Sequence, residues 1–211
     1  MILLADWHPD IIEFIISKMQ NPRILRYIVE NFEDEEIVSL AKEKLKFKPY
    51  TEQELNLFKK IAQYENAPGA GGFTKKEIND TKQKIVDGGT WEVNDIDYLT
   101  GANISVAITN DFMEAVKSEE DWGLRYPDTN NYNEEQMKAY DEKWHEVVDV
   151  RDWEKMGYPI ATHRTIKAKE LWDLITFCAT YSAEPGIMFI DRANEMAMSN
   201  VYGQKVIATN P

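Results

Sequence analysis

The sequence predicts an α/β protein, because strand-like and helix-like segments alternate through its second half. The stretch "NISVAITNDFMEAV" begins with Ile104, Val106 and Ile108 at every second position, the period of a half-buried strand, and continues with helical spacing. The strand-like segments "IATHRTI" and "IMFID" then flank "KAKELWDLITFCATYSAEPG", which predicts a long helix that ends at Pro185 and Gly186. Such alternation is typical of α/β architecture.

The N-terminal stretch "MILLADWHPD" has the pattern of a strand followed by a turn. Pro9 suits the first turn of a helix, and Asp10 suits its positively polarised amino end. The next residues, "IIEFIISK", are apolar on nearly every side, so this helix should be buried on most of its faces. Lys18 lies near its carboxyl end, where a cation is favoured.

Residues 21–98 have a different character, because four consecutive segments have helical spacing. They are "PRILRYIVENF", "DEEIVSLAKEKL", "TEQELNLFKKIAQYE" and "TKKEINDTKQKIVDGG", and prolines and glycine pairs separate them. We therefore predict a helical insertion at 21–98. It interrupts a domain that has two parts. Residues 1–20 form a strand and a helix, and residues 99–211 form the remaining strands and helices.

The elements after residue 103 follow the same kind of argument. Asp111 and Glu114 resemble a capping box at the start of the helix "DFMEAV". "WGLRYPDTNNYN" predicts a strand edge that runs into a loop, and two acidic helices follow it. "RANEMAMSNVYG" predicts a loop, and "VIATNP" combines a short apolar strand with turn chemistry.

Composition and charge argue against several classes of function. The chain has 24 basic and 37 acidic residues, and its net charge of −13 repels the phosphate backbone of duplex nucleic acid. No apolar run reaches the roughly 18 residues that a membrane helix needs, and the N-terminus has no signal-peptide pattern. With one cysteine, Cys178, no internal disulfide can form. These features predict a cytoplasmic protein with no membrane partner.

Motifs for self-contained catalysis are weak. The glycine-rich residues 69–73 lie between two helices and lack the P-loop pattern, so a flexible turn is favoured over phosphate binding. His8, His145 and His163 have no metal-ligand spacing, and no metal is predicted. Cys178 lies on an apolar helix face, which favours a buried hydrophobic residue over a nucleophile.

Glu184 and Asp191 flank the apolar strand "PGIMFI". Two carboxylates near a strand end can act as general acid and general base. The alternative is that they cap helices and turns, and this alternative is favoured because nothing in the sequence shows that they face one another. The residue patterns by themselves therefore predict a soluble α/β domain without a complete catalytic set.

Four stretches, in order along the chain, carry a resemblance to one family. They are "DWHPDIIEFIISK", "NISVAITNDFMEAV", "KAKELWDLITFCATYSAEPGIMFIDRAN" and "VIATNP". They closely resemble consecutive parts of the catalytic subunit of ribonucleotide reductase, in its adenosylcobalamin-dependent class II branch. The long helix with "AEPG" and "FIDRAN" is the most specific part. The resemblance covers nearly the whole chain and fits a helical insertion that some members carry.

This resemblance implies part of a ten-stranded α/β barrel, built from two antiparallel halves of parallel strands. The activity would be reduction of ribonucleotides to deoxyribonucleotides for DNA synthesis, by thiyl-radical chemistry. Asn210 matches the asparagine of the family's Asn-x-Cys-x-Glu motif, which holds the substrate ribose, and Pro211 at the first x favours the cobalamin branch. The radical cysteine and the glutamate would follow Pro211 and are absent from this chain.

The resemblance also implies a cofactor and partners. The complete enzyme would use adenosylcobalamin, bind a ribonucleotide diphosphate or triphosphate as substrate, and bind a deoxynucleoside triphosphate or ATP as allosteric effector. It would need the remainder of the reductase chain and a thioredoxin-like reductant, and it would form a homodimer. In the family, a loop between the first helix and the "NISV" strand links effector to substrate. Its ends here are Lys18, Gln20 and Asn21, and Thr100, Gly101, Ala102 and Asn103.

The chain ends directly before the position of the radical cysteine, and inteins usually begin with cysteine. This predicts one segment of a split or intein-interrupted reductase, although a truncation or an error in the gene model would give the same sequence. Such a segment should be inactive alone. An alternative from another class is a non-enzymatic, acidic helical interaction module formed by residues 22–98.

Overall fold

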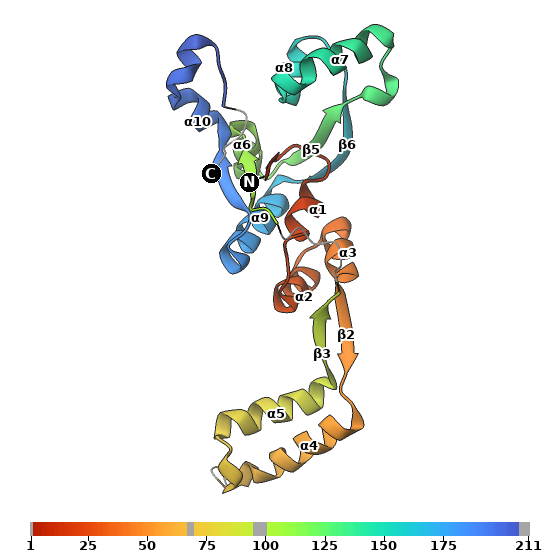
Figure 1. Ribbon diagram of the computed structural model, residues 1–211, viewed down its shortest axis with the longest axis vertical. Helices are drawn as coiled ribbons and strands as arrows, with labels where there is room; N and C mark the ends of the chain where they lie inside the picture. The colour runs from red at the N-terminus through yellow and green to blue at the C-terminus, as the bar shows by residue number, and fades with distance from the viewer. Residues whose placement is uncertain (1, 67–69, 95–100, 207–211) are drawn as a thin grey trace.

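A computed structural model describes residues 2–66, 70–94 and 101–206 of the protein (Figure 1). Helices and strands alternate, which confirms the predicted α/β class. The strands form three separate sheets: a parallel sheet of three strands and two antiparallel pairs. No helix in these ranges is long and apolar enough to cross a membrane.

The parallel sheet consists of β1 (Ile2–Ala5), β4 (Ile104–Ile108) and β7 (Gly186–Phe189), in the order β1-β4-β7. The prediction of a half-buried β4 is wrong, because all five of its residues are buried. As the central strand it is covered on both faces, and the small side chains of its second face permit this. Gly186 lies opposite Ser105, where an added Cβ would be 2.6 Å from the Ser105 hydroxyl oxygen.

Five helices complete what we call the body of the molecule: α1 (Ile11–Ile16), α2 (Pro22–Asn31), α3 (Glu35–Glu43), α6 (Asn110–Lys117) and α9 (Ala168–Ser182). Their apolar faces and the sheet enclose one hydrophobic core. Two of these helices, α2 and α3, belong to the predicted insertion, so part of the insertion packs into this core. Burial of α1 on most sides, as predicted, is confirmed by Ile11, Ile12, Ile15 and Ile16, none of which is exposed.

The arm of the molecule, residues 45–93, extends away from the body (Figure 1). Its stalk is an antiparallel pair, β2 (Leu45–Pro49) and β3 (Gly89–Val93), and its far end holds α4 (Glu52–Ala62) and α5 (Lys75–Asp87). Short 3-10 turns at Gln63–Asn66 and Ala70–Gly72, η1 and η2, lie between these helices. The four predicted helices of residues 21–98 are confirmed, whereas the two strands of the stalk were not predicted.

A third region, the lobe, covers residues 121–167. It contains the antiparallel pair β5 (Asp121–Pro127) and β6 (Ile160–Lys167), the 3-10 turn η3 (Thr129–Asn131), and the helices α7 (Glu134–Val147) and α8 (Val150–Lys155). An aromatic cluster around Trp153, whose ring stacks on Tyr158 with centroids 4.2 Å apart, fills the lobe. The strand, loop and acidic helices predicted here are confirmed.

Two local predictions are wrong. Thr109, not Asp111, caps α6, because the Thr109 hydroxyl accepts a hydrogen bond from the Phe112 N–H at 3.1 Å. The segment predicted as a loop contains a helix, α10 (Ile190–Met196), and the 3-10 turn η4 (Met198–Tyr202). The residues that follow strand β7 include good helix formers, and these continue directly into a helical turn.

The described residues form an open sheet and no closed barrel, so the expected ten-stranded barrel is not seen in them. In the order β1-β4-β7, β4 lies between the N-terminal strand and β7, so three segments that are far apart in the sequence share one sheet. The predicted strand "VIATNP" falls almost entirely on residues 207–211, which lie outside the described ranges.

Candidate functional site

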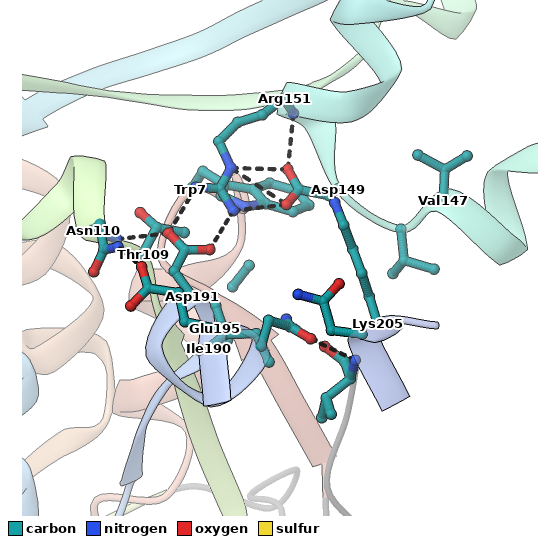
Figure 2. Close-up of a pocket in the computed structure, with 16 residues that line it drawn as sticks. Trp7, Thr109, Asn110, Val147, Asp149, Arg151, Ile190, Asp191, Glu195 and Lys205 are labelled. Atoms are coloured by element: carbon teal, nitrogen blue, oxygen red, sulfur yellow. Dashed lines mark hydrogen bonds and ion pairs between the residues drawn. The ribbon is translucent and has the colours of Figure 1, made fainter. Parts of the chain in front are cut away.

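A cavity of about 330 Å³ lies at the carboxyl ends of the three parallel strands (Figure 2). Its wall is formed by the residues that follow β1 and β4, by the start of α8, and by α10 with the segment after η4. In open parallel sheets, ligands bind at the carboxyl ends of the strands. The position of this cavity therefore makes it the candidate site.

A polar residue follows each of the three strands at this edge. Asp6 follows β1, Thr109 follows β4, and Asp191 comes after β7. The Thr109 N–H donates to Asp6 Oδ2 at 2.6 Å, and the Asn110 N–H donates to Asp191 Oδ2 at 2.8 Å. The N–H groups at a helix start have no partners within the helix and favour carboxylates. Two carboxylates thus fix the turn that carries Asn110.

Arg151, on α8, is clamped between two carboxylates (Figure 2). Its two Nη atoms donate to the two oxygens of Asp191, both at 2.8 Å. Its Nε and Nη2 donate to Asp149 at 3.1 and 2.8 Å. Asp111 Oδ2 lies 3.5 Å from Nη1. This network joins the lobe to the end of β7.

The clamp favours the charged forms of Asp191 and Arg151. Hydrogen bonds from Arg151 lower the pKa of the Asp191 carboxyl below its ordinary value. Hydrogen bonds to Asp191 and Asp149 raise the pKa of Arg151 further above its ordinary value. Because two carboxylates occupy the fork of the guanidinium, Arg151 has no paired donors left for a phosphate. Its role is to hold the wall of the cavity rather than to bind an anion.

Other polar side chains of the wall differ in how they are occupied. Asn194 Nδ2 donates to the Val206 carbonyl at 3.0 Å, and Asn194 Oδ1 accepts from the Val206 N–H at 2.6 Å. Lys205 forms an ion pair with Asp152. Asn110 donates from Nδ2 to Glu195 at 3.2 Å, but its Oδ1 accepts no bond from any described residue. Glu195 is exposed to solvent, and its Oε2 lies 3.7 Å from Arg192 Nη1 in an exposed ion pair. Asn110 and Glu195 are therefore the groups best placed to contact a ligand.

Asp6 lies beneath this wall and does not line the cavity. Its side chain is fully buried, and Oδ1 has no hydrogen-bond partner within the described ranges. Burial raises the pKa of the Asp6 carboxyl to about 7, although hydrogen bonds from Thr109 oppose the shift. A carboxyl group that titrates near neutral pH thus lies between the ends of β1 and β4.

The family model of the ribonucleotide reductase barrel domain matches residues 1–211, the whole sequence. The chain belongs to this family. The resemblance inferred from four sequence stretches is thereby confirmed at the level of the ribonucleotide reductase family. The cavity therefore belongs to a ribonucleotide reductase barrel domain. Ribonucleotide reductases are oxidoreductases that make deoxyribonucleotides.

The described residues of the predicted effector loop do not line this cavity. Lys18 forms an ion pair with Glu184 at 3.0 Å, and Asn21 caps α2 by accepting a bond from the Arg23 N–H. Gln20 is exposed beside them in a separate hollow of about 490 Å³. Glu184 precedes β7, so this group lies toward the amino ends of the strands, opposite to the cavity. Its role toward an effector stays a prediction.

The other predicted positions are in part outside the described ranges. Thr100 and Asn210 are among the residues that the structure does not describe. Gly101 and Ala102 precede β4, and the Asn103 carbonyl accepts a hydrogen bond from the Ile2 N–H at 2.8 Å. Asn103 therefore helps to align β1 with β4, and no contact with the cavity involves it.

Two further alternatives from the sequence are resolved. Glu184 and Asp191 lie at opposite ends of β7 and have different partners, so they are not an acid–base pair. Asp191 instead accepts a bond at the start of α6, which is a capping role. Cys178 is fully buried, and burial raises the pKa of its thiol to about 12, as expected for a hydrophobic residue. In the described parts of the chain, no group of His, Cys, Asp or Glu could hold a metal.

Sequence reasoning missed Asn110, Asp149, Arg151 and Glu195. The polar residue directly after each apolar strand was a usable signal, because it marks the carboxyl edge of a parallel sheet. It would have selected Asp6, Thr109 and Asp191. No comparable signal marks Asp149 and Arg151, because the lobe brings them to Asp191 across 40 positions of sequence.

Proposed function

We propose that this chain forms part of the substrate-side wall of a ribonucleotide reductase catalytic site, and that the cavity at the carboxyl ends of β1, β4 and β7 contacts the ribonucleotide. The observation that supports this most strongly is the position of the cavity. In a domain of this family, it lies where parallel strands end and where backbone N–H groups and polar side chains converge.

The groups of the cavity have separable roles in this proposal. Arg151, with Asp149 and Asp191, fixes the distance between the lobe and the sheet. Asn110 and Glu195 provide an amide oxygen and a carboxylate, which suit the hydroxyl groups of a sugar. The volume of about 330 Å³ is at the lower end of the roughly 300–1,000 Å³ of small-molecule sites. It accommodates the nucleoside part of a ligand better than the whole nucleotide.

The radical chemistry of the proposal requires a sulfur that this sequence does not offer. Cys178 is its one cysteine, and that thiol is fully buried in the core between α9 and its neighbours. A thiyl radical must touch the C–H bond that it attacks, and a buried thiol cannot. We infer that the radical cysteine, with its glutamate, belongs to residues outside this chain and that Asn210 orients the ribose beside it.

Adenosylcobalamin, as the source of the radical, is proposed on the sequence resemblance alone. The described residues do not fit it, because a corrin with its axial groups is much larger than a drug-sized ligand and the cavity has only about 330 Å³. No step of the proposal is therefore assigned to this cofactor. The proposed substrate is a ribonucleoside diphosphate or triphosphate.

Binding of cytidine diphosphate and cytidine triphosphate to the whole chain, measured by isothermal titration calorimetry, tests the cavity. We expect saturable binding of at least one of the two. Asn110→Ala and Glu195→Ala should each weaken it by about 5- to 10-fold, because each removes about one hydrogen bond. The matched control variants are Asn79→Ala and Glu52→Ala, exposed residues of the arm, which should leave the affinity unchanged.

Absence of saturable binding, or equal weakening by the control variants, would exclude the cavity as the substrate site. A second assay tests the origin of the sulfur. The chain with adenosylcobalamin and dithiothreitol should form no deoxycytidine nucleotide. Turnover by the pure chain would show that the radical cysteine is not supplied from outside it.

A further inference from the structure

A groove between the arm and α2 of the body has no part in the proposed substrate site. In Figure 1, α2 and α5 project on the same side of the hairpin, with β3 between them. The space enclosed by these elements has a volume of about 860 Å³, within the range of ligand sites. Its wall combines cationic side chains from both helices with aromatic side chains from the stalk.

The charge of this groove is opposite to that of the chain. Four cationic side chains line it, against two carboxylates, in a chain with a net charge of −13. The four are Arg23, Arg26, Lys76 and Lys84. All are exposed, and only Arg26 pairs with a carboxylate of the described residues, Glu30, at 3.3 Å. Lys84 Nζ lies 5.5 Å from the centroid of the Phe58 ring, a contact that leaves its charge in place. Cations that no carboxylate neutralises attract phosphate groups.

Aromatic rings lie beside these cations. Phe47 and Trp91 face each other across the stalk, with ring centroids 5.1 Å apart, and the Arg26 guanidinium lies 5.8 Å from the Trp91 ring. The pair stabilises the hairpin. It also leaves 39% of Phe47 and 37% of Trp91 exposed, on the wall of the groove. Exposed rings beside cations are how proteins hold bases joined to phosphates.

We propose that this groove binds a nucleotide, with its phosphates at Lys76, Lys84 and Arg23 and its base against Trp91 and Phe47. The ligand is either a free nucleotide or the units of a single-stranded nucleic acid, which share this chemistry. The inference is independent of the substrate site, because no residue of the groove lines the cavity.

Three probes test the proposal on the whole chain: ATP, inorganic tripolyphosphate, and a fluorescein-labelled deoxythymidine decamer. The variant Lys76→Glu/Lys84→Glu reverses two charges of the groove. The matched control, Lys59→Glu/Lys60→Glu, makes the same change on α4, outside the groove. Trp91→Leu removes the ring. Circular dichroism checks that every variant retains its helices, and the double variant Asn110→Ala/Glu195→Ala weakens binding at the cavity.

We expect saturable binding of ATP or the decamer that survives in the Asn110→Ala/Glu195→Ala variant. Lys76→Glu/Lys84→Glu should weaken it at least 10-fold, and the control less than 2-fold. Trp91→Leu should weaken ATP or decamer binding more than 5-fold and tripolyphosphate binding less than 2-fold. If the decamer binds more tightly than ATP, the ligand is a single-stranded nucleic acid. If ATP binds more tightly, the ligand is a free nucleotide.

Three results would overturn the proposal. The first is that neither ATP nor the decamer binds saturably. The second is that the two charge-reversal variants weaken binding equally, which would indicate general attraction to the arm. The third is that Trp91→Leu changes nothing while tripolyphosphate binds as well as ATP, because the site would then recognise phosphate without a base.

Discussion

The body of the chain encloses a continuous core, in which Ile15, Leu25 and Leu174 have no exposed surface. In the arm, by contrast, the residues described as buried are Ile78, Thr81 and Gly89. The arm is instead ordered by contacts among its own elements: the pairing of β2 with β3, two capping boxes, and ion pairs such as Lys48–Glu92 at 3.2 Å. A shared hydrophobic core therefore determines the body, whereas hydrogen bonds, caps and ion pairs near the surface determine the arm.

This difference bears on function, because the two candidate sites are built in the two ways. The cavity joins residues from β1, β4, α8 and α10, so it exists only when the body is folded. The groove lies where the stalk and α5 of the arm meet α2 of the body, and both of these helices carry their own N-terminal caps. We therefore expect the groove to change shape more readily than the cavity, since regions with few buried contacts open at lower free energy.

The largest expected effect comes from the core. Phe112 is fully buried and meets Trp122 edge to face at 5.2 Å, so Phe112→Ala should cost about 3–5 kcal/mol of unfolding free energy. Phe58→Ala, in the arm, removes a half-buried ring that contacts Tyr50 at 5.0 Å and should cost less than half as much. Urea unfolding followed by circular dichroism measures both. Equal losses would contradict the contrast between body and arm.

The second effect concerns pH and has opposite signs in the two regions. The pKa of Asp6 is about 7 in the folded chain and 3.8 as its ordinary value, so its stabilising contribution is complete below pH 4 and is lost as pH rises to 7. At about 1.4 kcal/mol per pKa unit, the loss is a few kcal/mol. Asp6→Asn should remove this dependence of the unfolding free energy on pH. A comparison of the urea midpoints of both proteins between pH 4 and 8 would detect the difference.

The arm should respond to pH in the other direction. Hydrogen bonds from Thr51 and Thr74 lower the pKa values of Glu54 and Glu77, so the contribution of these carboxylates is present at neutral pH and is lost in acid. Hydrogen exchange should show that, as pH falls, helix content is lost first at residues of the arm.

In the body, the Asp6→Asn variant is the test. If its unfolding free energy depends on pH as strongly as that of the unchanged chain, Asp6 is not the titrating group.

The smallest expected effect is the loss of one cap. Thr74 accepts the Glu77 N–H at 3.3 Å, and Thr74→Ala should cost about 1 kcal/mol of helix stability. Because the arm depends on local contacts, hydrogen exchange should increase in α5 and not in α9. Thr74→Ser keeps the hydroxyl and is the matched control. Increased exchange in both helices would mean that arm and body unfold as one unit.

The sequence was sufficient where structure is local. Helical spacing located α4, α5, α7 and α9, since each carries its own periodicity and termini. The stalk was missed, because Lys46, Lys48 and Pro49 obscure a strand of five residues whose alternation rests on Leu45 and Phe47. The full burial of β4 was missed for another reason: alternation shows one apolar face but cannot show that neighbouring strands and helices cover the other.

The site was predictable only in part. Asp191 could be recognised as a carboxylate at a strand end, but its partner could not, because Arg151 reaches it through the packing of the lobe against the sheet. The sequence also could not predict that Asp6 Oδ1 is buried without a hydrogen-bond partner among the described residues. The stretch "LLAD" shows an acidic residue after a strand, but it does not show that this residue is buried.

The pairing of Leu45 with Val93 has a consequence for how such a chain can vary. The polypeptide departs from the body and comes back to it at neighbouring points, so everything between them can be exchanged for a tight two-residue turn without moving either junction. Homologues could gain or lose this appendage in a single genetic event. A designer could likewise graft it onto another scaffold that offers two adjacent ends.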